Sequence, residues 1–284
     1  MTTTRNVRSV FSGVPTIEGA GVHLSRAFGY HQVPLLDPFL MLDDFHTATP
    51  DEYLAGFPWH PHRGIETITY ILEGLVEHGD SMGNKGVIGA GDVQWMTAGS
   101  GIIHQEMPQE SPTGTMWGFQ LWANLPASQK MMPPRYRDIK AADIPEVTLA
   151  NGVTAKIISG ELNGVQGPVR EIVIDPVLMD ITMPADTDFR VPVKDGYTVV
   201  IYVLSGAARF DEQPGEMIAP QHAVLYEKSG DQVSIITADQ PARFLFLSGK
   251  PLNEPVAWQG PIVMNSQEEL RIAFEEYRQG TFIK

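Results

Sequence analysis

Two short motifs, about forty residues apart in the chain, carry the side chains best suited to chemistry. The first contains His60 and His62, and the second contains His104 and Glu106. One residue separates the members of each pair, and on a β-strand this spacing directs both side chains to the same face. Two neighbouring strands could therefore aim three imidazoles and one carboxylate at one point. Such a set is typical of first-row transition-metal sites in oxygen-handling enzymes, and it lacks the thiolates of many structural zinc sites.

The histidine pair alone also fits two ordinary hydrogen-bonding histidines on either side of a proline. Its context favours the metal interpretation, because Pro61 stiffens the backbone between the two rings and glycines follow at regular places. The remaining histidines have no partner at ligand spacing, and we interpret them as ordinary polar residues. They are His23, His31, His46, His78 and His222.

The segments around these motifs have the composition of short β-strands. Residues 66–73, 93–99 and 115–123 are rich in β-branched and aromatic residues and are separated by glycine turns, with no amphipathic helix between them. This pattern predicts an antiparallel sandwich or barrel. Similar segments follow in the second half of the chain: 156–159, 172–174, 188–193, 197–204, 207–210, 223–226, 233–236 and 243–247.

The two halves resemble each other in sequence, which indicates a duplicated barrel. Residues 197–206 are similar to residues 67–74, and the turn that begins at Gly230 is similar to the one at Gly91. Residues 124–150 contain several prolines and no sustained period, so we predict a connection there, with a short helical turn at 128–130. The predicted domains are 1–138 and 139–284. The second domain has His222 as its only histidine, so we do not expect a second metal site there.

One helix is predicted near the end of the chain. Ser266 and Glu269 form a capping box, and Gly280 ends the segment. The apolar stripe is typical of a helix that packs on a sheet and carries no chemistry. It consists of Leu270, Ala273, Phe274 and Tyr277.

The composition excludes several classes of function. The net charge of −14 makes direct nucleic-acid binding unfavourable, since an acidic surface repels phosphates. The chain has no cysteine, which excludes disulfides, thiolate metal sites and a cysteine nucleophile. No apolar run approaches the length of a membrane span, and the start lacks a signal-peptide pattern. We therefore expect a soluble, cytoplasmic protein without membrane contact, and a monomer by default.

Longer stretches of the chain resemble a known family. Residues 35–44, 57–74, 91–108 and 248–265 are similar to the pirin family, a two-barrel branch of the cupin superfamily. The resemblance covers almost the whole chain and implies an all-β fold of two tandem cupin barrels, which are double-stranded β-helix or jelly-roll barrels, with a short C-terminal helix. Thr97 stands where many cupins have proline, and this departure is itself pirin-like.

The resemblance also implies a ligand set and a metal. In pirins the metal is held by residues that correspond here to His60, His62, His104 and Glu106. Many other cupins use a glutamate that corresponds to Glu66, which we place outside the ligand set. Fe(II) is the expected cofactor, and manganese, cobalt, nickel and copper remain open because the geometry suits them as well. Protonation of the imidazoles predicts metal loss as the pH falls towards about 6.5.

Two functions follow from the resemblance. The first is quercetin 2,3-dioxygenase-like ring opening of a flavonol or a similar enolisable aromatic with O₂, in which Glu106 is both ligand and candidate catalytic base. The alternative is a metal- and redox-dependent regulator that binds a partner protein without turnover. A barrel that merely uses a metal for stability is a third possibility.

Around the site we expect apolar walls and groups that orient a ligand. The candidate wall residues are Phe57, Trp59, Trp95, Met96 and Met116. Asp44 and Gln120 are candidates for orienting a ligand histidine or a bound water molecule.

Overall fold

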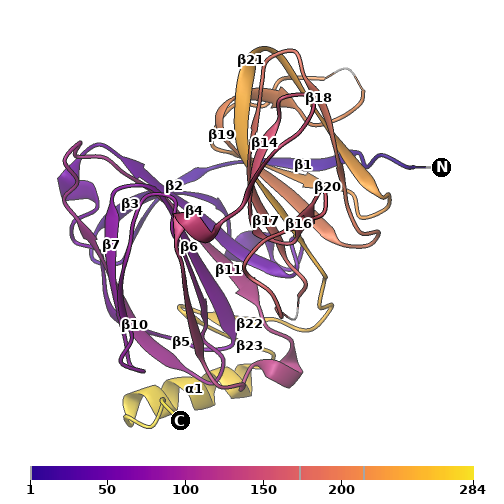
Figure 1. Cartoon of the computed structure of the whole chain (residues 1–284). Helices are drawn as coiled ribbons and strands as arrows, with labels where there is room; N and C mark the ends of the chain where they lie inside the picture. Colours follow the sequence, from indigo (N-terminus) through magenta and orange to yellow (C-terminus); the bar gives the residue numbers. More distant parts are fainter. Residues whose placement is uncertain (1, 173, 214) are drawn as a thin grey trace. The chain divides into compact units, whose positions relative to one another are not determined.

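The computed structural model describes residues 2–172, 174–213 and 215–284, and its regular structure is almost entirely β (Figure 1). This confirms the predicted all-β class. The chain forms two compact units, each of which contains parts from distant regions of the sequence. The unit called here the N-terminal barrel consists of Val14–Leu35, Phe39–Ala141 and Leu252–Lys284. The C-terminal barrel consists of Met1–Gly13, Leu36–Pro38 and Ala142–Pro251, with Met1 itself outside the described residues.

The N-terminal barrel contains two antiparallel sheets. The strands of the larger sheet run in the order β12 (Arg135–Ile139), β9 (Val93–Thr97), β6 (Ile65–Glu73), β11 (Met116–Asn124), β4 (Phe39–Thr47), β3 (Val22–Phe28) and β2 (Val14–Glu18). The strands of the smaller sheet run in the order β5 (Phe57–His62), β10 (Ile102–Gln109), β7 (Leu75–Asp80) and β8 (Lys85–Ile88). Both predicted metal motifs lie in the smaller sheet.

The strands of the C-terminal barrel form one main sheet. Its order is β1 (Val7–Ser12), β20 (His222–Tyr226), β19 (Thr198–Arg209), β21 (Gln232–Gly249), β17 (Val177–Met183), β14 (Thr154–Ser159) and β13 (Glu146–Thr148), while β18 (Asp188–Pro192) also pairs with β21. A small hairpin joins β15 (Glu161–Leu162) and β16 (Val165–Gln166). In Figure 1 the indigo β1 runs among the orange strands, as its pairing with β20 requires.

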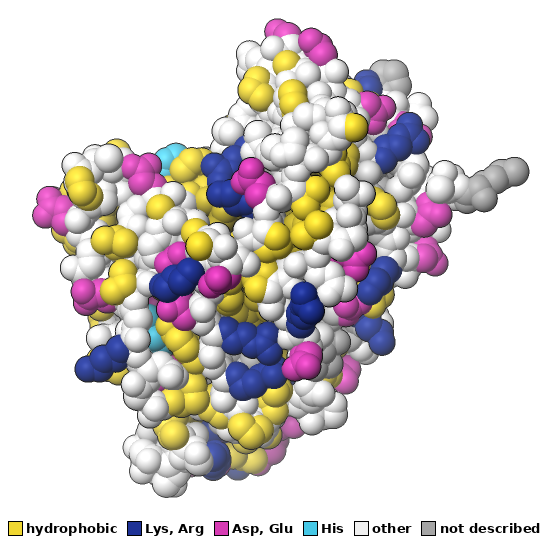
Figure 2. All heavy atoms as spheres, in the orientation of Figure 1, with side chains coloured by type: hydrophobic (Ala, Val, Ile, Leu, Met, Phe, Trp, Pro, Cys, Tyr) yellow, Lys and Arg dark blue, Asp and Glu magenta, His cyan; other side chains and the backbone are white. Residues whose placement is uncertain are grey.

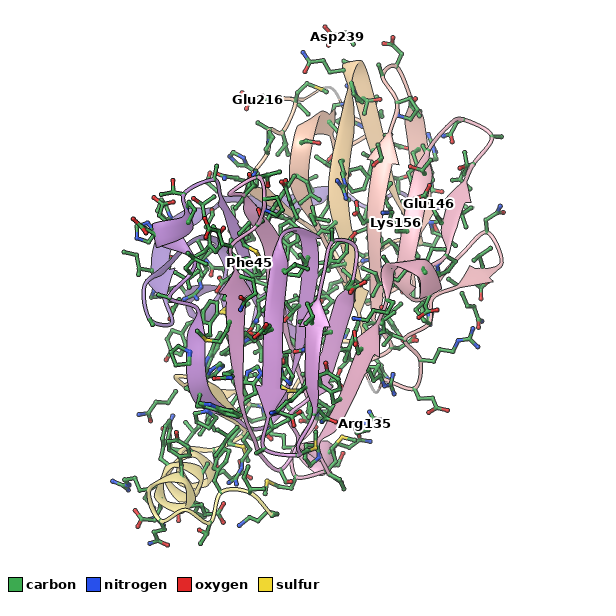
Figure 3. The ribbon with its side chains drawn as sticks, turned by 60° about the vertical axis from the view of Figure 1, so that its left-hand side comes forward. Phe45, Arg135, Glu146, Lys156, Glu216 and Asp239 are labelled. Carbon is green, nitrogen blue, oxygen red and sulfur yellow. The ribbon has the colours of Figure 1, made fainter. Side chains whose placement is uncertain are left out.

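The surface of this barrel carries ordinary cross-strand pairs. Figure 3 shows Glu146 and Lys156 on neighbouring strands, and these two residues lie directly opposite each other in the β13–β14 register. Opposite charges in such positions stabilise a sheet slightly. On the face drawn in Figure 2, basic and acidic side chains are interspersed.

The end of the chain returns to the N-terminal barrel. A hairpin of β22 (Ala257–Gln259) and β23 (Ile262–Met264) precedes α1 (Gln267–Arg278), which packs on both of these strands. The predicted helix is confirmed. Ser266 caps it by accepting a hydrogen bond from the Glu269 backbone N–H, and Leu270 and Ala273 are its buried residues. Among the described residues, no helix is long and apolar enough to cross a membrane.

The segment 124–150 is more ordered than the sequence indicated. It contains the short helical turn η3 (Ala127–Gln129), followed by β12, the turn η4 (Ala141–Asp143) and β13. The change from one compact unit to the other falls within this segment, at Ala141–Ala142. Its strands β12 and β13 were not predicted, because short strands that complete sheet edges need little sequence signal of their own. The strands β1 to β4 and the turns η1 (Tyr30–Gln32) and η2 (Pro50–Glu52) were not predicted either. The predicted strand 172–174 includes Val173, which lies outside the described residues.

The cores of the two barrels differ in kind. The described part of the C-terminal barrel contains a large continuous cluster of buried apolar side chains, including Ile201, Val203 and Phe244. In the described part of the N-terminal barrel the buried apolar side chains form several smaller clusters, and Phe45, which is labelled in Figure 3, belongs to one of them. Buried polar residues such as Thr69 and Gln94 also lie in this barrel. Its interior is therefore suited to hold a polar site.

Candidate metal centre

The two predicted motifs lie on adjacent strands. In the antiparallel register of β5 and β10, His104 is directly opposite His60, and Ile102 is opposite His62. The register shifts between His104 and Glu106, where β5 contains one extra residue. Residues that face each other across a strand pair project to the same side, so the register gathers the three histidines on one face of the smaller sheet.

The three imidazoles form a compact cluster. One ring nitrogen from each of His60, His62 and His104 lies within 4.8 Å of the others, and the ring centroids are 4.4–4.9 Å apart. The Nε2 atoms of His60 and His62 are 3.0 Å apart. Two ligand nitrogens that each lie about 2.1 Å from a metal, at a right angle, would be about 3.0 Å apart. The cluster therefore fits a metal ion.

Hydrogen bonds fix the tautomers of two of these rings. The Nδ1 of His60 lies 2.8 Å from the carbonyl oxygen of Pro58, and that of His62 lies 3.0 Å from the carbonyl oxygen of Pro261. A carbonyl oxygen only accepts, so in both rings Nδ1 donates and the lone pair is on Nε2. Two lone pairs that face each other at 3.0 Å repel unless a proton or a metal ion lies between them. This arrangement supports a metal at the cluster.

Burial keeps two of the imidazoles neutral. Desolvation lowers the pKa of His62 and of His104 well below the usual value, and the neighbouring His60 lowers both further. Neutral imidazole is the form that binds metals. The sequence-based prediction of metal loss near pH 6.5 used an unperturbed pKa, and the lowered values move protonation of these two ligands to more acidic pH.

Glu106 follows His104 by two residues on β10 and is buried. Its carboxylate accepts hydrogen bonds from the Thr69 hydroxyl at 2.7 Å and from the Gln120 amide at 2.8 Å. Among the described residues, the ligand atoms that lie mutually within 4.8 Å belong to the three histidines, and the Glu106 carboxylate is not one of them. Its role as a fourth ligand stays a prediction. Gln120 contacts this carboxylate rather than orienting a histidine.

The structure places Glu66 away from the cluster. Thr69 points to the barrel interior, where it reaches Glu106, and the period-two alternation of β6 sends Glu66 to the opposite face. There its carboxylate accepts hydrogen bonds from Trp95 Nε1 at 3.0 Å and Thr97 Oγ1 at 2.7 Å. Trp95 is therefore not a wall of the metal site, contrary to the sequence-based suggestion.

Asp44 also faces away from the site. Its neighbour Asp43 lines the pocket beside the histidines, so alternation along β4 turns Asp44 to the other face of the sheet. Asp43 forms a bidentate ion pair with Arg26, with both N–O distances at 2.8 Å. The sequence suggested Asp44 as a polar group beside the metal site, but the pair of Arg26 and Asp43 lines the pocket instead.

A pocket of about 560 Å³ opens beside His60 and His62. Its walls contain Trp122, Trp258 and Tyr30. The Trp258 ring contacts the Trp122 ring at a centroid distance of 5.8 Å and the Tyr30 ring at 5.6 Å. The Trp122 ring meets the His62 ring edge-on at 5.1 Å. The pocket thus leads from the histidines outward along aromatic surfaces, which suits a flat, apolar ligand.

The predicted wall residues are divided among different places. Phe57 lines the pocket, and Met96 packs in a cluster with the wall residue Trp122. Met116 lies beside a much smaller cavity that also borders Glu106. Trp59 is 53% exposed and points away from the histidines, because it alternates with His60 along β5.

Two buried cations hold the segment that follows the first motif. Lys130 Nζ donates to the carbonyl oxygens of Gly64 and Val263 and to Asn124 Oδ1, at 2.7–3.0 Å. Burial lowers the pKa of Lys130 to about 7. Arg63 donates to the carbonyl oxygens of Ser100 and Phe282. These contacts tie the end of β5 to the C-terminal segment that supplies the Pro261 carbonyl.

The sequence analysis missed His78. This residue lies opposite Glu106 in the β10–β7 register, and its ring centroid is 5.4 Å from that of His104. Its Nε2 lies 3.4 Å from a carboxylate oxygen of Asp80, and both side chains are buried. His78 and Asp80 have the same one-residue spacing as the two metal motifs. That spacing was the signal that could have identified them.

The two-barrel fold and the histidine cluster together define a bicupin with a candidate metal site in one barrel. The family comparisons agree with this class. The profile described as Pirin matches residues 21–123, and the profile described as Pirin C-terminal cupin domain matches residues 178–283. The chain belongs to the pirin family.

Individual relatives span nearly the whole chain. This chain is 45% identical to a Pseudomonas aeruginosa protein named "Putative quercetin 2,3-dioxygenase", over 99% of both chains. The crystal structure of a quercetin 2,3-dioxygenase from Acinetobacter baumannii has a TM-score of 0.89 and 31% identity, again over 99% of both chains. A bacterial pirin from Escherichia coli, solved in complex with nickel(II), has a TM-score of 0.64 and 23% identity, covers 86% of this chain and 98% of its own, and shows the shared fold.

Proposed function

We propose that this protein is a mononuclear metal-dependent dioxygenase that opens the ring of a flavonol, or of a similar enolisable aromatic, with O₂. The observation that carries this proposal is a cluster of three imidazoles, two of them held neutral by burial, at the base of an aromatic-lined pocket. The similarity to proteins named as quercetin 2,3-dioxygenases supports the same reaction class.

His60, His62 and His104 would hold the metal, with Glu106 as the fourth ligand. We expect Fe(II), and other divalent transition metals suit the same donors. A bound metal would act as a Lewis acid and lower the pKa of the enol hydroxyl that it coordinates. The nickel(II) complex of the Escherichia coli pirin supports divalent metal binding in this fold.

The protein's own groups would orient the substrate and move one proton. Trp122, Trp258 and Tyr30 would hold the flat rings through stacking and edge contacts. Glu106 would accept the enol proton. Hydrogen bonds from Thr69 and Gln120 fix the orientation of its carboxylate, which supports this role. In the overall reaction both atoms of O₂ enter the ring-opened ester, and one ring carbon leaves as carbon monoxide.

The test is a turnover measurement on the full chain. The protein is loaded anaerobically with Fe(II) and exposed to quercetin and O₂ while flavonol absorbance and released carbon monoxide are followed. Wild type should consume flavonol and release carbon monoxide in equal amounts, and His62→Ala should do neither. Glu106→Gln should keep part of its metal and lose most turnover, by about 10²–10⁴-fold. Wild-type turnover in Glu106→Gln would exclude the base role.

A negative result would redirect the assignment. Absence of turnover in wild type with iron demonstrably bound would favour the alternative of a metal- and redox-dependent regulator with a protein partner. Pulldown of a partner only in the presence of metal would then support that alternative.

A further inference from the structure

The three clustered histidines differ in the hydrogen-bond partner of the ring nitrogen that would not bind the metal. His60 and His62 each donate Nδ1–H to a backbone carbonyl. His104 is 0% exposed, and neither of its ring nitrogens has a hydrogen-bond partner among the described residues. A histidine that binds a metal almost always donates its other N–H to a carboxylate, a carbonyl or a water molecule. The outer nitrogen of His104 therefore needs a partner that the protein does not supply directly.

Other buried polar groups without a partner lie around the same ring. Among the described residues these include His78 Nδ1, both ends of the Gln94 amide and the Tyr136 hydroxyl. The His78 ring lies 5.4 Å from the His104 ring and stacks on the Tyr136 ring at 4.9 Å. Burial and Asp138 raise the pKa of Tyr136, whereas hydrogen bonding with the Gln94 amide lowers it. The amide therefore approaches the phenol, although the two do not form a direct hydrogen bond of normal geometry.

The strand registers show that these groups face one interior space. Gln94 on β9 is opposite Thr69 on β6, and Thr69 donates to Glu106. Glu106 on β10 is in turn opposite His78 on β7. On β8, a Cβ at Gly86 would lie 2.8 Å from the Tyr136 hydroxyl, so Gly86 lets the phenol approach this strand closely. His78 thus contacts the His104 ring, Tyr136 stacks on His78, and Gln94 faces the same interior through Thr69 and Glu106. The lining of the pocket includes His60 and His62 but none of these residues.

We propose that His78, Gln94 and Tyr136 hold an ordered water cluster against His104, and that this water orients the His104 imidazole for the metal. Leaving one buried polar group unpaired costs about 1–3 kcal/mol, and several together would be prohibitive. A buried water molecule makes about three hydrogen bonds to such groups. His78 is fixed in turn by Asp80, so the three residues act as positioning residues for His104. This inference rests on the proposed metal site and not on the dioxygenase reaction.

The test compares metal affinity in matched variants of the full chain. Ni(II), which is stable to redox change, is titrated against a competing chelator. Gln94→Met removes both hydrogen-bonding ends at similar volume, and His78→Phe removes the partner on the other side. Each should weaken Ni(II) binding by about 10–100-fold. The double variant should be weaker by less than the product of the two single effects, since both act through the same water.

Gln105→Met is the control, because Gln105 lies between His104 and Glu106 on the same strand and points to the other face. It should bind Ni(II) as wild type does. Thermal unfolding of the metal-free proteins shows whether a variant is folded. Equal affinity in wild type, Gln94→Met and His78→Phe would overturn the proposal.

A second measurement needs no variant. NMR of wild type with ¹⁵N-labelled histidine, together with a high-resolution crystal structure, should show the outer N–H of His104 protected from solvent exchange and bonded to ordered water. A direct hydrogen bond from that N–H to a protein group, or no ordered water there, would contradict the proposal. Neither measurement reads turnover, so failure of the dioxygenase assignment would leave both results interpretable.

Discussion

The two barrels share a fold type and have opposite interiors. In the C-terminal barrel, inward residues of the central strands, such as Val199, Ile201 and Phe244, are apolar and fully buried. In the N-terminal barrel, inward positions carry Thr69, Gln94 and the clustered histidines. Apolar interiors stabilise a domain, whereas buried polar groups are tolerated when they are paired. The comparison indicates that the C-terminal barrel uses its interior for apolar burial, whereas the N-terminal barrel gives up part of that burial to a polar site.

The largest expected effect tests the stabilising role of the C-terminal barrel. Phe244 is fully buried in its core, so Phe244→Ala should lower the free energy of unfolding by about 3–5 kcal/mol through lost burial and a cavity. Denaturant unfolding of the metal-free protein measures this loss. Ni(II) affinity of the folded variant should stay at the wild-type value. A large loss of affinity would show that the two functions are not divided between the barrels.

The next effect tests whether the metal binds in one barrel only. His60→Ala should weaken metal binding by about 100-fold, since the loss of one ligand from the proposed site removes about 3 kcal/mol of binding free energy. His222→Ala is the matched control, because His222 lies at the start of β20 in the C-terminal barrel. Competition titration with a chelator measures both variants. An equal loss in His222→Ala would contradict the assignment of the site to the N-terminal barrel.

The pH dependence of stability should reveal the polar interior. In the folded metal-free protein the pKa values of His62 and His104 are lowered by burial, whereas in the unfolded chain they lie near 6.5. Below that pH the unfolded state binds more protons, so stability falls as the pH falls. The expected slope is about 1.4 kcal/mol per pH unit for each histidine.

Urea unfolding at a series of pH values from 7 downward, about one unit apart, measures this slope. His104→Asn should reduce it, because one of the two depressed groups is gone. A slope unchanged by that substitution would show that other groups cause the acid sensitivity.

The smallest expected effect concerns the support of Glu106. Thr69→Val removes the hydroxyl that donates to its carboxylate and keeps the shape of the side chain. Turnover of the iron-loaded protein should fall by about tenfold, as is usual when a group that supports a ligand is lost. Thr67→Val, on the same face of β6 and without a hydrogen-bond partner among the described residues, is the control and should keep full turnover. Equal turnover in both variants would separate Thr69 from the function of Glu106.

The histidine motifs were predictable because strand alternation is a local rule. The spacing of His60 and His62 and of His104 and Glu106 was enough to predict a shared face, and the β5–β10 register places the histidines together. The same rule, applied to His78 and Asp80, would have found the neighbouring pair. The terminal helix was predictable for a similar reason, since its cap and stripe lie within one short segment.

Other features depend on contacts between distant parts of the chain. The carbonyl that holds His62 comes from Pro261, and the pocket wall includes Trp258, both about two hundred residues away in sequence. The sheet face on which Glu66 and Asp44 lie could not be predicted in this way. It depends on which side of each strand is interior, and composition does not reveal this for strands buried on both faces. The edge strand β12 could not be predicted from its own residues, because it becomes ordered as a strand through its pairing with β9.

The most direct test of the central claim is the location of the metal. Crystals of the full chain grown with Ni(II) would be measured at the nickel absorption edge, and an anomalous difference map would be calculated. The account predicts one strong peak between the Nε2 atoms of His60 and His62 and a ring nitrogen of His104, with no comparable peak in the C-terminal barrel. A map without a peak at these histidines, or with an equal peak in the C-terminal barrel, would contradict it.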